Sequence, residues 1–160
     1  MELLVRDAIK EDVPFILDLI RELAAFEKAP TEVAITEDTL LRDGFGINPL
    51  FRCFIAEFER EIVGLALTYQ KYSTWKGPCV FLEDIIVKQS FRRNGIGQRL
   101  FEAVIVHASS VNAGRLEWQV LDWNKSAISF YKKFGVEFDE KWINCKLRNN
   151  QLKLLTNGDL

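Results

Sequence analysis

Two adjacent carboxylates, Glu83 and Asp84, interrupt an otherwise apolar run from Cys79 to Val87. The run predicts a strand that is buried on both faces, and alternation along it predicts that the two side chains point to opposite faces. An unpaired carboxylate is costly there unless its pKa rises or a cation pairs with it. For Glu83 we favour a catalytic role, because a carboxylate with a raised pKa or a water link suits a general base. For Asp84, a functional group and a structural ion pair are equally open.

An anion site is predicted in the segment Arg92-Arg93-Asn94-Gly95-Ile96-Gly97, between a predicted strand and a predicted helix. The glycines allow a tight turn and a close approach of a ligand to the backbone. The helix that follows adds free N–H groups and the positive end of its dipole, which suit a phosphate. The alternative is a glycine-rich turn with two solvated arginines. The spacing fits neither a Walker A loop nor G-x-G-x-x-G, because Leu100 stands where the third glycine would be.

Tyr131 is a third candidate. Asn124 is a good N-cap for a helix over 125–134, which Gly135 ends. Tyr131 lies seven residues after Asn124, so the two share a helix face, which Ile128 and Phe134 mark as directed to the core. A tyrosine there needs a partner for its hydroxyl. Taken alone, this pattern is typical of a structural buried tyrosine.

Histidine and cysteine chemistry is not favoured. His107 is the single histidine, so a triad or a metal site of several histidines would have to be built on it. Cys53, Cys79 and Cys145 are odd in number and lie in apolar runs, which indicates reduced core residues rather than disulfides. No cysteine pair has zinc-finger spacing, and no metal is expected.

Helices and strands that position these residues follow from hydrophobic periodicity. Apolar positions at helical spacing predict helices over 12–26 and 95–111, the second with Ile105 on its apolar face. A shorter helix begins after Thr36 as N-cap. Strands are predicted at Leu3–Arg6, Phe51–Phe58, Ile62–Tyr72, Cys79–Val87, Leu116–Leu121 and about 141–148. The order indicates an α/β fold with a mixed sheet covered on both faces.

The composition bounds the class of protein. The chain has 160 residues, and 48% of them are hydrophobic, which predicts one ordered domain over 1–160 with a sizeable core. The net charge of −2 argues against a nucleic-acid partner. No apolar run is long enough for a membrane span, and the N-terminal residues do not form a signal-peptide pattern. A cytoplasmic protein is therefore expected.

These motifs together resemble the GNAT family of N-acetyltransferases. The segment RRNGIG is similar to the family's Arg/Gln-x-x-Gly-x-Gly/Ala motif, and Asn124 to Gly135 is similar to its later coenzyme A motif. The chain is closer still to the diamine acetyltransferase branch, which includes spermidine/spermine and thialysine acetyltransferases. The similar stretches cover most of the chain: IRELAAFEK, LLRDGFGINPLFRCFIAE, TWKGPCVFLEDIIV, FRRNGIG and LDWNKSAISFYKKFG.

The resemblance implies an acetyl-CoA-dependent enzyme with a mixed, mostly antiparallel sheet flanked by helices. Glu83 would be the base, through water, and Tyr131 the general acid. The amine pocket would be formed by Phe26, Glu27, Trp75, Glu83 and Asp84. Acetyl-CoA would be bound by Ile85, Ile86, Val87, Arg92, Arg93, Asn94, Gly95, Ile96, Gly97, Gln98, Asn124 and Tyr131.

Departures from the branch bear on the acceptor. Ser73 stands where the branch usually carries an acid, and the segment 137–142 is shorter than a branch loop that carries an acidic substrate contact. Asp139 and Glu140 are both open as replacements. Fewer acids favour a shorter amine, or an amino acid such as thialysine or lysine, over a long polyamine. The segment Leu-Asp-Trp-Asn also resembles the thialysine type.

Other functions stay open. One is a GNAT enzyme for a different acceptor, such as a peptide N-terminus or an antibiotic amine. Another is a non-catalytic acetyl-CoA sensor, against which the presence of Tyr131 and Glu83 argues. By resemblance alone, the partners are a small amine and a second copy in a homodimer.

Overall fold

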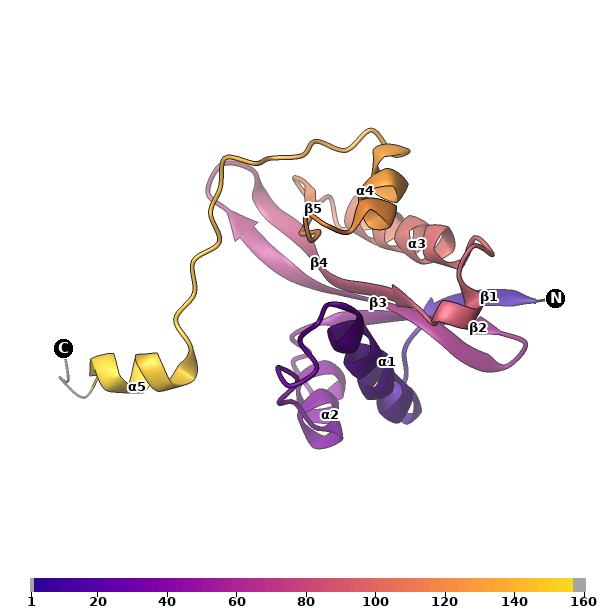
Figure 1. Ribbon diagram of the computed structural model, residues 1–160, viewed down its shortest axis with the longest axis horizontal. Helices are drawn as coiled ribbons and strands as arrows, with labels where there is room; N and C mark the ends of the chain where they lie inside the picture. Colours follow the sequence, from indigo (N-terminus) through magenta and orange to yellow (C-terminus); the bar gives the residue numbers. More distant parts are fainter. Residues whose placement is uncertain (1, 157–160) are drawn as a thin grey trace. The chain divides into compact units, whose positions relative to one another are not determined.

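The computed structural model describes residues 2–156, which divide into two compact units, residues up to Gln119 and residues from Val120 onward. The first unit holds a five-stranded sheet and its covering helices (Figure 1). The sheet has the order β1-β2-β3-β4-β5. It is antiparallel except for the parallel pair β4–β5. Its strands are β1 (Leu3–Asp7), β2 (Arg52–Phe58), β3 (Glu61–Ser73), β4 (Gly77–Val87) and β5 (Leu116–Trp118).

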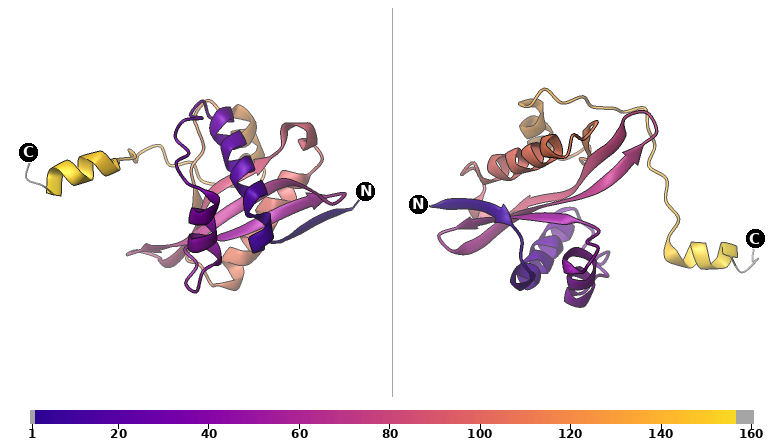
Figure 2. Two further views of the ribbon diagram at one scale, coloured as in Figure 1. Left: turned by 90° about the horizontal axis from the view of Figure 1, so that it is seen from below. Right: turned by 180° about the vertical axis from the view of Figure 1, so that it is seen from behind.

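Helices cover both faces of this sheet. The helices α1 (Val13–Phe26) and α2 (Glu37–Phe45) lie on one face, and α3 (Ile96–Ser110) lies on the other (Figure 2). The core under α1 combines helix residues with strand residues, among them Ile55, Leu65, Leu67 and Ile86. Two short 3₁₀ turns, Lys10–Asp12 and Gln89–Phe91, connect elements. The second unit holds α4 (Lys125–Lys132) and α5 (Asn149–Thr156).

The predicted α/β fold with a mixed, mostly antiparallel sheet is confirmed. Helix α1 begins with Pro14 in its first turn, where proline's missing N–H is not needed. The hydroxyl of Thr36 accepts a hydrogen bond from Thr39 N, so it caps α2 as predicted. Helix α3 begins at Ile96, one residue after the predicted start, with Gly95 as its N-cap. Ile105 is the exception on its apolar face, because it is exposed while Ala108 is buried.

The predictions near the C-terminus are less accurate. β5 ends at Trp118 instead of Leu121, and residues 141–148 form no strand. The segment alternates as a strand does, but no strand in the described part of the chain provides its hydrogen-bonding ladder, and a strand is not stable without one. As a consequence Cys145 is exposed rather than a core residue. Cys53 and Cys79 are buried as predicted, and all three are free thiols.

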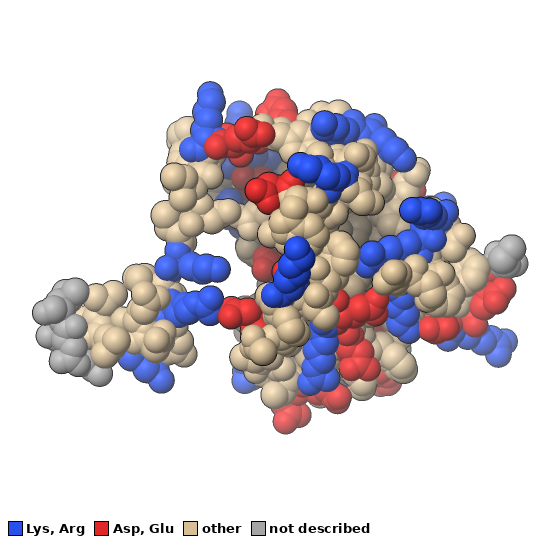
Figure 3. Space-filling model, in the orientation of Figure 1, with Lys and Arg blue, Asp and Glu red and all other residues tan. Residues whose placement is uncertain are grey.

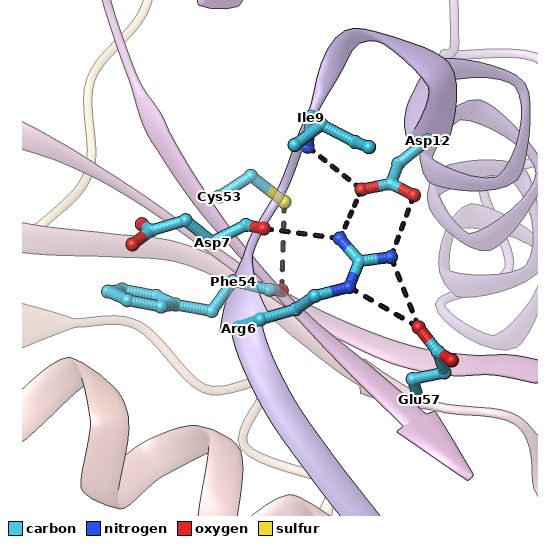
Figure 4. Close-up of polar contacts among 7 residues, drawn as sticks. All are labelled: Arg6, Asp7, Ile9, Asp12, Cys53, Phe54 and Glu57. Carbon is cyan, nitrogen blue, oxygen red and sulfur yellow. Dashed lines mark hydrogen bonds and ion pairs between the residues drawn. The ribbon is translucent and has the colours of Figure 1, made fainter. Parts of the chain in front are cut away.

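An ion-pair network holds the N-terminal end of α1 (Figure 4). Arg6 donates to both carboxylate oxygens of Asp12, at 2.6 and 3.0 Å, and to Glu57 at 3.3 Å. The backbone N–H of Ile9 donates to Asp12 at 2.8 Å. Every charge in this network therefore has a partner, which is what a buried ion pair requires.

Candidate active site

A β-bulge in β4 places the two carboxylates. Leu67 pairs with Asp84 while the next residue of β3, Thr68, pairs with Leu82. Glu83 is therefore an extra residue with no partner on β3. A bulge of this kind bends the strand and changes the direction of the side chains beside it.

The bulge overturns the prediction that Glu83 and Asp84 point to opposite faces. Asp84 is paired with Leu67, which belongs to the core under α1, so Asp84 lies on that face. Tyr69 is two residues from Leu67 and shares its face. Burial raises the pKa of the Tyr69 phenol, and the charge of Glu83 raises it further. The same charge also acts on Asp84, so the Glu83 carboxylate lies near Tyr69 and Asp84 on this face. Alternation fails here because it holds only within a regular ladder.

Asp84, and not Glu83, is the more buried carboxyl of the pair. Asp84 is half-buried and Glu83 is exposed. Burial raises the pKa of Asp84 to about 6, and the charges of Glu83 and Glu27 add to the effect. Burial also raises the pKa of Glu27, which follows the last residue of α1. Two of the acids predicted for the amine pocket, Glu27 and Glu83, thus act on the third, Asp84, at one end of α1.

Acidic side chains also surround this region more widely. In Figure 3 they gather over α1 and α2, on the face of the sheet that carries Asp84. A cation that approaches this face meets a negative potential.

The aromatic residues predicted for the pocket have different settings. The ring of Phe26 lies under the Arg92 guanidinium, with 5.0 Å from its centroid to Cζ. Trp75 lies in the turn between β3 and β4 and is 79% exposed. Ser73 shapes that turn, because its hydroxyl accepts from the N–H groups of Trp75 and Lys76, both at 3.2 Å.

One edge of β4 is open where coenzyme A contacts are predicted. β4 pairs with β5 only at Val80, Phe81 and Leu82. Within the described residues, the backbone from Glu83 to Val87 has no strand neighbour on this edge. The N–H and C=O groups of Ile85, Ile86 and Val87 that point this way can therefore pair with an extended ligand, except the Val87 carbonyl, which accepts from Arg92 Nε.

The predicted anion loop has an unusual backbone. Gly95 has φ 76° and Arg93 has φ 66°, both in the left-handed region. For a non-glycine residue this is a sparsely populated conformation, and such strain is concentrated at functional sites. The first helical bond runs from Arg99 N to Gly95 O. The N–H groups of Ile96, Gly97 and Gln98 precede it and have no partner within the helix.

Side chains fix the rest of this loop. Arg92 Nε donates to the carbonyl of Val87 at 3.0 Å, and Asn94 Nδ2 donates to that of Phe91 at 3.2 Å. Gln98 Nε2 donates a hydrogen bond to Glu102 Oε1 at 2.9 Å. The loop is therefore held in shape by its own contacts, which leaves the amides of α3 directed outward for an anion.

In the second unit, Asn124 and Tyr131 stand as the sequence predicts. The side-chain oxygen of Asn124 accepts from Ala127 N at 3.2 Å and caps α4. Tyr131 is 4% exposed, and this burial raises its pKa to about 12. Its phenol is consequently protonated at neutral pH.

The remaining candidates for chemistry have structural partners. Nδ1 of His107 lies 3.0 Å from Arg52 Nη1. Burial raises the pKa of the Cys53 thiol, which does not suit a nucleophile. Among the described residues, no cluster of three or more His, Cys, Asp or Glu side chains could hold a metal ion. No helix between residues 2 and 156 has the length and hydrophobicity to cross a bilayer.

Sequence reasoning did not identify two residues on the same face as the carboxylates, Tyr69 and Glu117. Glu117 pairs with Phe81 across β4–β5, and Tyr69 pairs with Phe81 across β3–β4. Both therefore lie on the face of Glu83 and Asp84. The one available signal was the period of two from Leu67 to Tyr69, which places Tyr69 on the core face.

Comparisons with known proteins identify the family and the fold of this chain. Residues 16–136 match the acetyltransferase (GNAT) family. The chain is 41% identical over 142 residues to the thialysine N-epsilon-acetyltransferase of Bos taurus. This match covers 84% of each protein. The chain is also 36% identical over 158 residues to the human spermidine/spermine N(1)-acetyltransferase-like protein 1. This match covers 92% of the chain and 23% of the human protein.

A solved structure shares the fold. An integron cassette protein from V. cholerae has a TM-score of 0.79 at 21% identity, with 98% of each chain covered. Sequence and fold therefore agree: the chain belongs to the GNAT acetyltransferase family and is an acetyl-CoA-dependent N-acetyltransferase.

Proposed function

We propose that the enzyme transfers the acetyl group of acetyl-CoA directly to a primary amine of a small cationic substrate. The acceptor would be a thialysine- or lysine-like amino acid, or a di- or polyamine. The carboxyl cluster of Glu27, Glu83 and Asp84 supports this most directly. No cationic side chain among residues 2–156 forms an ion pair with these acids, and such a cluster favours a bound cation. The acceptors in the relatives' names, thialysine and spermidine/spermine, are cationic amines of this kind.

Glu83 would act as the general base. A free alkyl amine has a pKa of about 10 and must lose a proton before it attacks. Glu83 is exposed, so a water molecule has access to its carboxylate and can pass the proton to it. Asp84, which is more buried, would bind the amine by charge. Trp75 would add a cation–π contact, and Phe26 would line the pocket.

Tyr131 would be the general acid that protonates the departing thiolate. Its burial and raised pKa keep the proton on the phenol until a strong base forms beside it. Tyr131→Phe should then reduce kcat much more than acetyl-CoA affinity, because the ring contacts remain. An equal loss in both would argue against the acid role.

Acetyl-CoA would be held mainly by backbone groups. The open edge of β4 at Ile85 to Val87 would pair with the pantetheine arm, and a backbone N–H there would polarise the thioester carbonyl. The amides of residues 93–98, with Arg92 beside them, would bind the pyrophosphate. Asn124 would line the cofactor channel.

Ser73 limits the range of acceptors that the proposed pocket would bind. Its hydroxyl accepts two backbone N–H groups and is 8% exposed, so it adds no charge to the amine pocket. This favours a thialysine- or lysine-like amino acid over a long polyamine. Asp139 and Glu140 are both exposed, and the Asp139 carboxylate accepts from Lys141 N at 3.0 Å, which leaves both open as acceptor contacts.

A thiol-release assay with acetyl-CoA and a panel of amines tests the proposal. The panel would hold spermidine, spermine, putrescine, thialysine, lysine and a peptide amine. Preference for thialysine or lysine supports the proposed acceptor, and preference for spermidine means that other acids restore a polyamine site. Turnover of the peptide alone would indicate a different acceptor. Acetyl-CoA binding without turnover of any amine would favour a sensor.

The enzyme would act as a cytoplasmic homodimer. The homodimer rests on the resemblance to the diamine acetyltransferase branch, and the location rests on the three free cysteines, which are typical of a reducing compartment. Light scattering of the purified chain tests the first, because a dimer has twice the mass of 18.5 kDa. Fluorescent tagging in cells tests the second.

A further inference from the structure

Three charged side chains on the face of the carboxyl cluster have no role in the chemistry described so far. Lys71 on β3 and Arg115, which precedes β5, both form ion pairs with Glu117 on β5. Lys71 Nζ is 3.2 Å from one Glu117 oxygen, and Arg115 Nη2 is 3.1 Å from the other. Two cations therefore share one carboxylate, which leaves one positive charge in excess.

The strand register places this group next to the carboxyl cluster. Glu117 pairs with Phe81 and Phe81 pairs with Tyr69, so the three form one row across the sheet. Tyr69 is two residues from Leu67, the partner of Asp84. Asp84 therefore lies in the next row on the same face, about 7 Å along the strands.

Contacts hold the two cations in place and leave them accessible. The Lys71 ammonium lies over the Phe81 ring, 5.5 Å from its centroid, which keeps it in the row of Glu117. Lys71 and Arg115 are exposed, and Glu117 is half-buried. The hairpin end of β3 and β4, which carries Lys71, extends past α1 and α2 (Figure 1). A ligand can therefore reach both cations from solvent.

We propose that Lys71 and Arg115 form the subsite for the α-carboxylate of an amino-acid acceptor, and that Glu117 holds the two cations together. This rests on the proposed function, in which the carboxyl cluster binds the reacting amine. The enzyme then selects a molecule with an amine at one end and a carboxylate at the other. A polyamine lacks the carboxylate and brings further positive charge toward the two cations, which disfavours it.

The distance between the two rows suits an acceptor of the size of lysine or thialysine. An extended side chain of either amino acid places its terminal nitrogen about 7 Å from the carboxyl carbon. The two rows are separated by about the same distance along the strands. An acceptor whose amine lies at Asp84 can therefore bring its carboxylate to the row of Glu117.

The chemistry of the two cations also suits a carboxylate. A guanidinium and an ammonium each carry more N–H donors than one contact with Glu117 engages. Hydrogen bonds between such cations and a carboxylate are charge-assisted, and they are stronger than bonds between neutral groups. A carboxylate bound there also balances the excess positive charge of the group.

The test compares lysine with lysinamide, which keeps both amines but has a neutral carboxamide in place of the carboxylate. The readout is the ratio of kcat/KM for lysine to kcat/KM for lysinamide, because general effects on the amine pocket cancel in it. The wild-type enzyme should prefer lysine. Lys71→Met and Arg115→Met should each lower the ratio about tenfold, since each removes a charge-assisted hydrogen bond to the carboxylate. Lys71→Arg keeps the charge and should retain most of the preference.

Lys10→Met is the matched control. Lys10 is exposed and lies in the 3₁₀ turn before α1, at the opposite end of that helix from Glu27. The variant removes the same charge and should have the wild-type ratio. Thermal unfolding of all four variants would show that each is folded.

Two sets of outcomes separate the subsite from the proposed function. An unchanged ratio in both Lys71→Met and Arg115→Met, or a wild-type enzyme that does not prefer lysine to lysinamide, would overturn the carboxylate subsite alone. Turnover of cadaverine, which is lysine without its carboxylate, together with no turnover of lysine would also overturn the subsite alone. If the wild-type enzyme acetylates none of these compounds and no polyamine, the proposed function is wrong and the subsite with it.

Discussion

Carboxylates that lie near the two ends of α1 have pKa values shifted in opposite directions. At the N-terminal end, Asp12 is 4% exposed. Burial pushes its pKa up, but the hydrogen bonds from Arg6 and Ile9 N–H together outweigh it, so the pKa is lowered. At the C-terminal end, burial raises the pKa of Asp84 to about 6, and two more acids add to the shift. One end is fully paired, and the other gathers like charges.

This difference separates a structural cluster from a binding cluster. A paired buried carboxylate stabilises the fold as long as its partners stay. A buried carboxylate among like charges destabilises the fold at neutral pH, and a bound cation removes that penalty. The same residue type on the same sheet face thus acts in opposite ways, depending on whether the chain supplies the cation.

The largest expected effect is on catalysis at the unpaired end. Glu83→Gln should lower kcat about 100-fold, because a general base contributes at least that much, and it should leave stability nearly unchanged since Glu83 is exposed. Glu57→Gln, at the paired end, is the control. It loses part of the ion pair with Arg6 but should keep wild-type kcat. Steady-state kinetics and urea unfolding of both variants measure the contrast. Similar kcat values in the two would remove the functional distinction between the ends.

The next effect is on stability at the paired end. Arg6→Met leaves Asp12 and Glu57 without their cation, which should lower the free energy of unfolding by about 3 kcal/mol. Arg21→Met is the control, because Arg21 pairs with Asp18 at 3.5 Å on the exposed surface. There the loss should stay below about 1 kcal/mol. Urea unfolding of both proteins gives the two values, and equal losses would contradict the distinction between buried and exposed pairs.

Asp84→Asn and Asp12→Asn should change the free energy of unfolding in opposite directions. The pKa of Asp84 is higher in the folded state, so the destabilisation is absent well below 3.8, grows as pH rises, and is complete above about 6. Asp84→Asn should therefore stabilise the protein by about 2 kcal/mol at neutral pH and lose that advantage in acid. Its KM for the amine should rise, because a negative charge is removed.

Asp12→Asn should instead destabilise the protein at neutral pH. The pKa of Asp12 is lowered in the folded state, so the stability it contributes is present above 3.8 and is lost as pH falls further. Thermal unfolding of both variants across pH distinguishes the signs. A destabilised Asp84→Asn at neutral pH would mean that Asp84 has a cationic partner in solution.

Sequence reasoning located the unpaired end but not its geometry. An acid pair in an apolar run is visible in the sequence, and so are the glycine loop and the cap of α4. The bulge is not visible, because it depends on the register between β3 and β4, and alternation alone assigned Glu83 and Asp84 to opposite faces. Tyr69 was missed for the same reason, since its place beside the carboxylates also depends on the register between β3 and β4.

The paired end was not predicted as a network. Glu57 is far from Arg6 and Asp12 in the sequence and joins them only through the pairing of β1 with β2. The strand predicted over 141–148 failed for a related reason. Its alternation is genuine, but a strand also requires a neighbour, and local pattern carries no information on that.

The smallest expected effect tests whether a group outside both clusters follows the same logic. Burial and the nearby Arg52 lower the pKa of His107, although Asp7 opposes them. The unfolded chain therefore binds a proton first, and stability should fall slightly as pH drops through about 6.5 and toward the lowered value. His107→Gln should flatten the pH dependence of thermal unfolding in that window, while Asp7 and Arg52 keep their ion pair at 2.6 Å. A slope that persists in the variant would assign it to another group, and Asp84 is excluded as its source because its shift predicts the opposite sign.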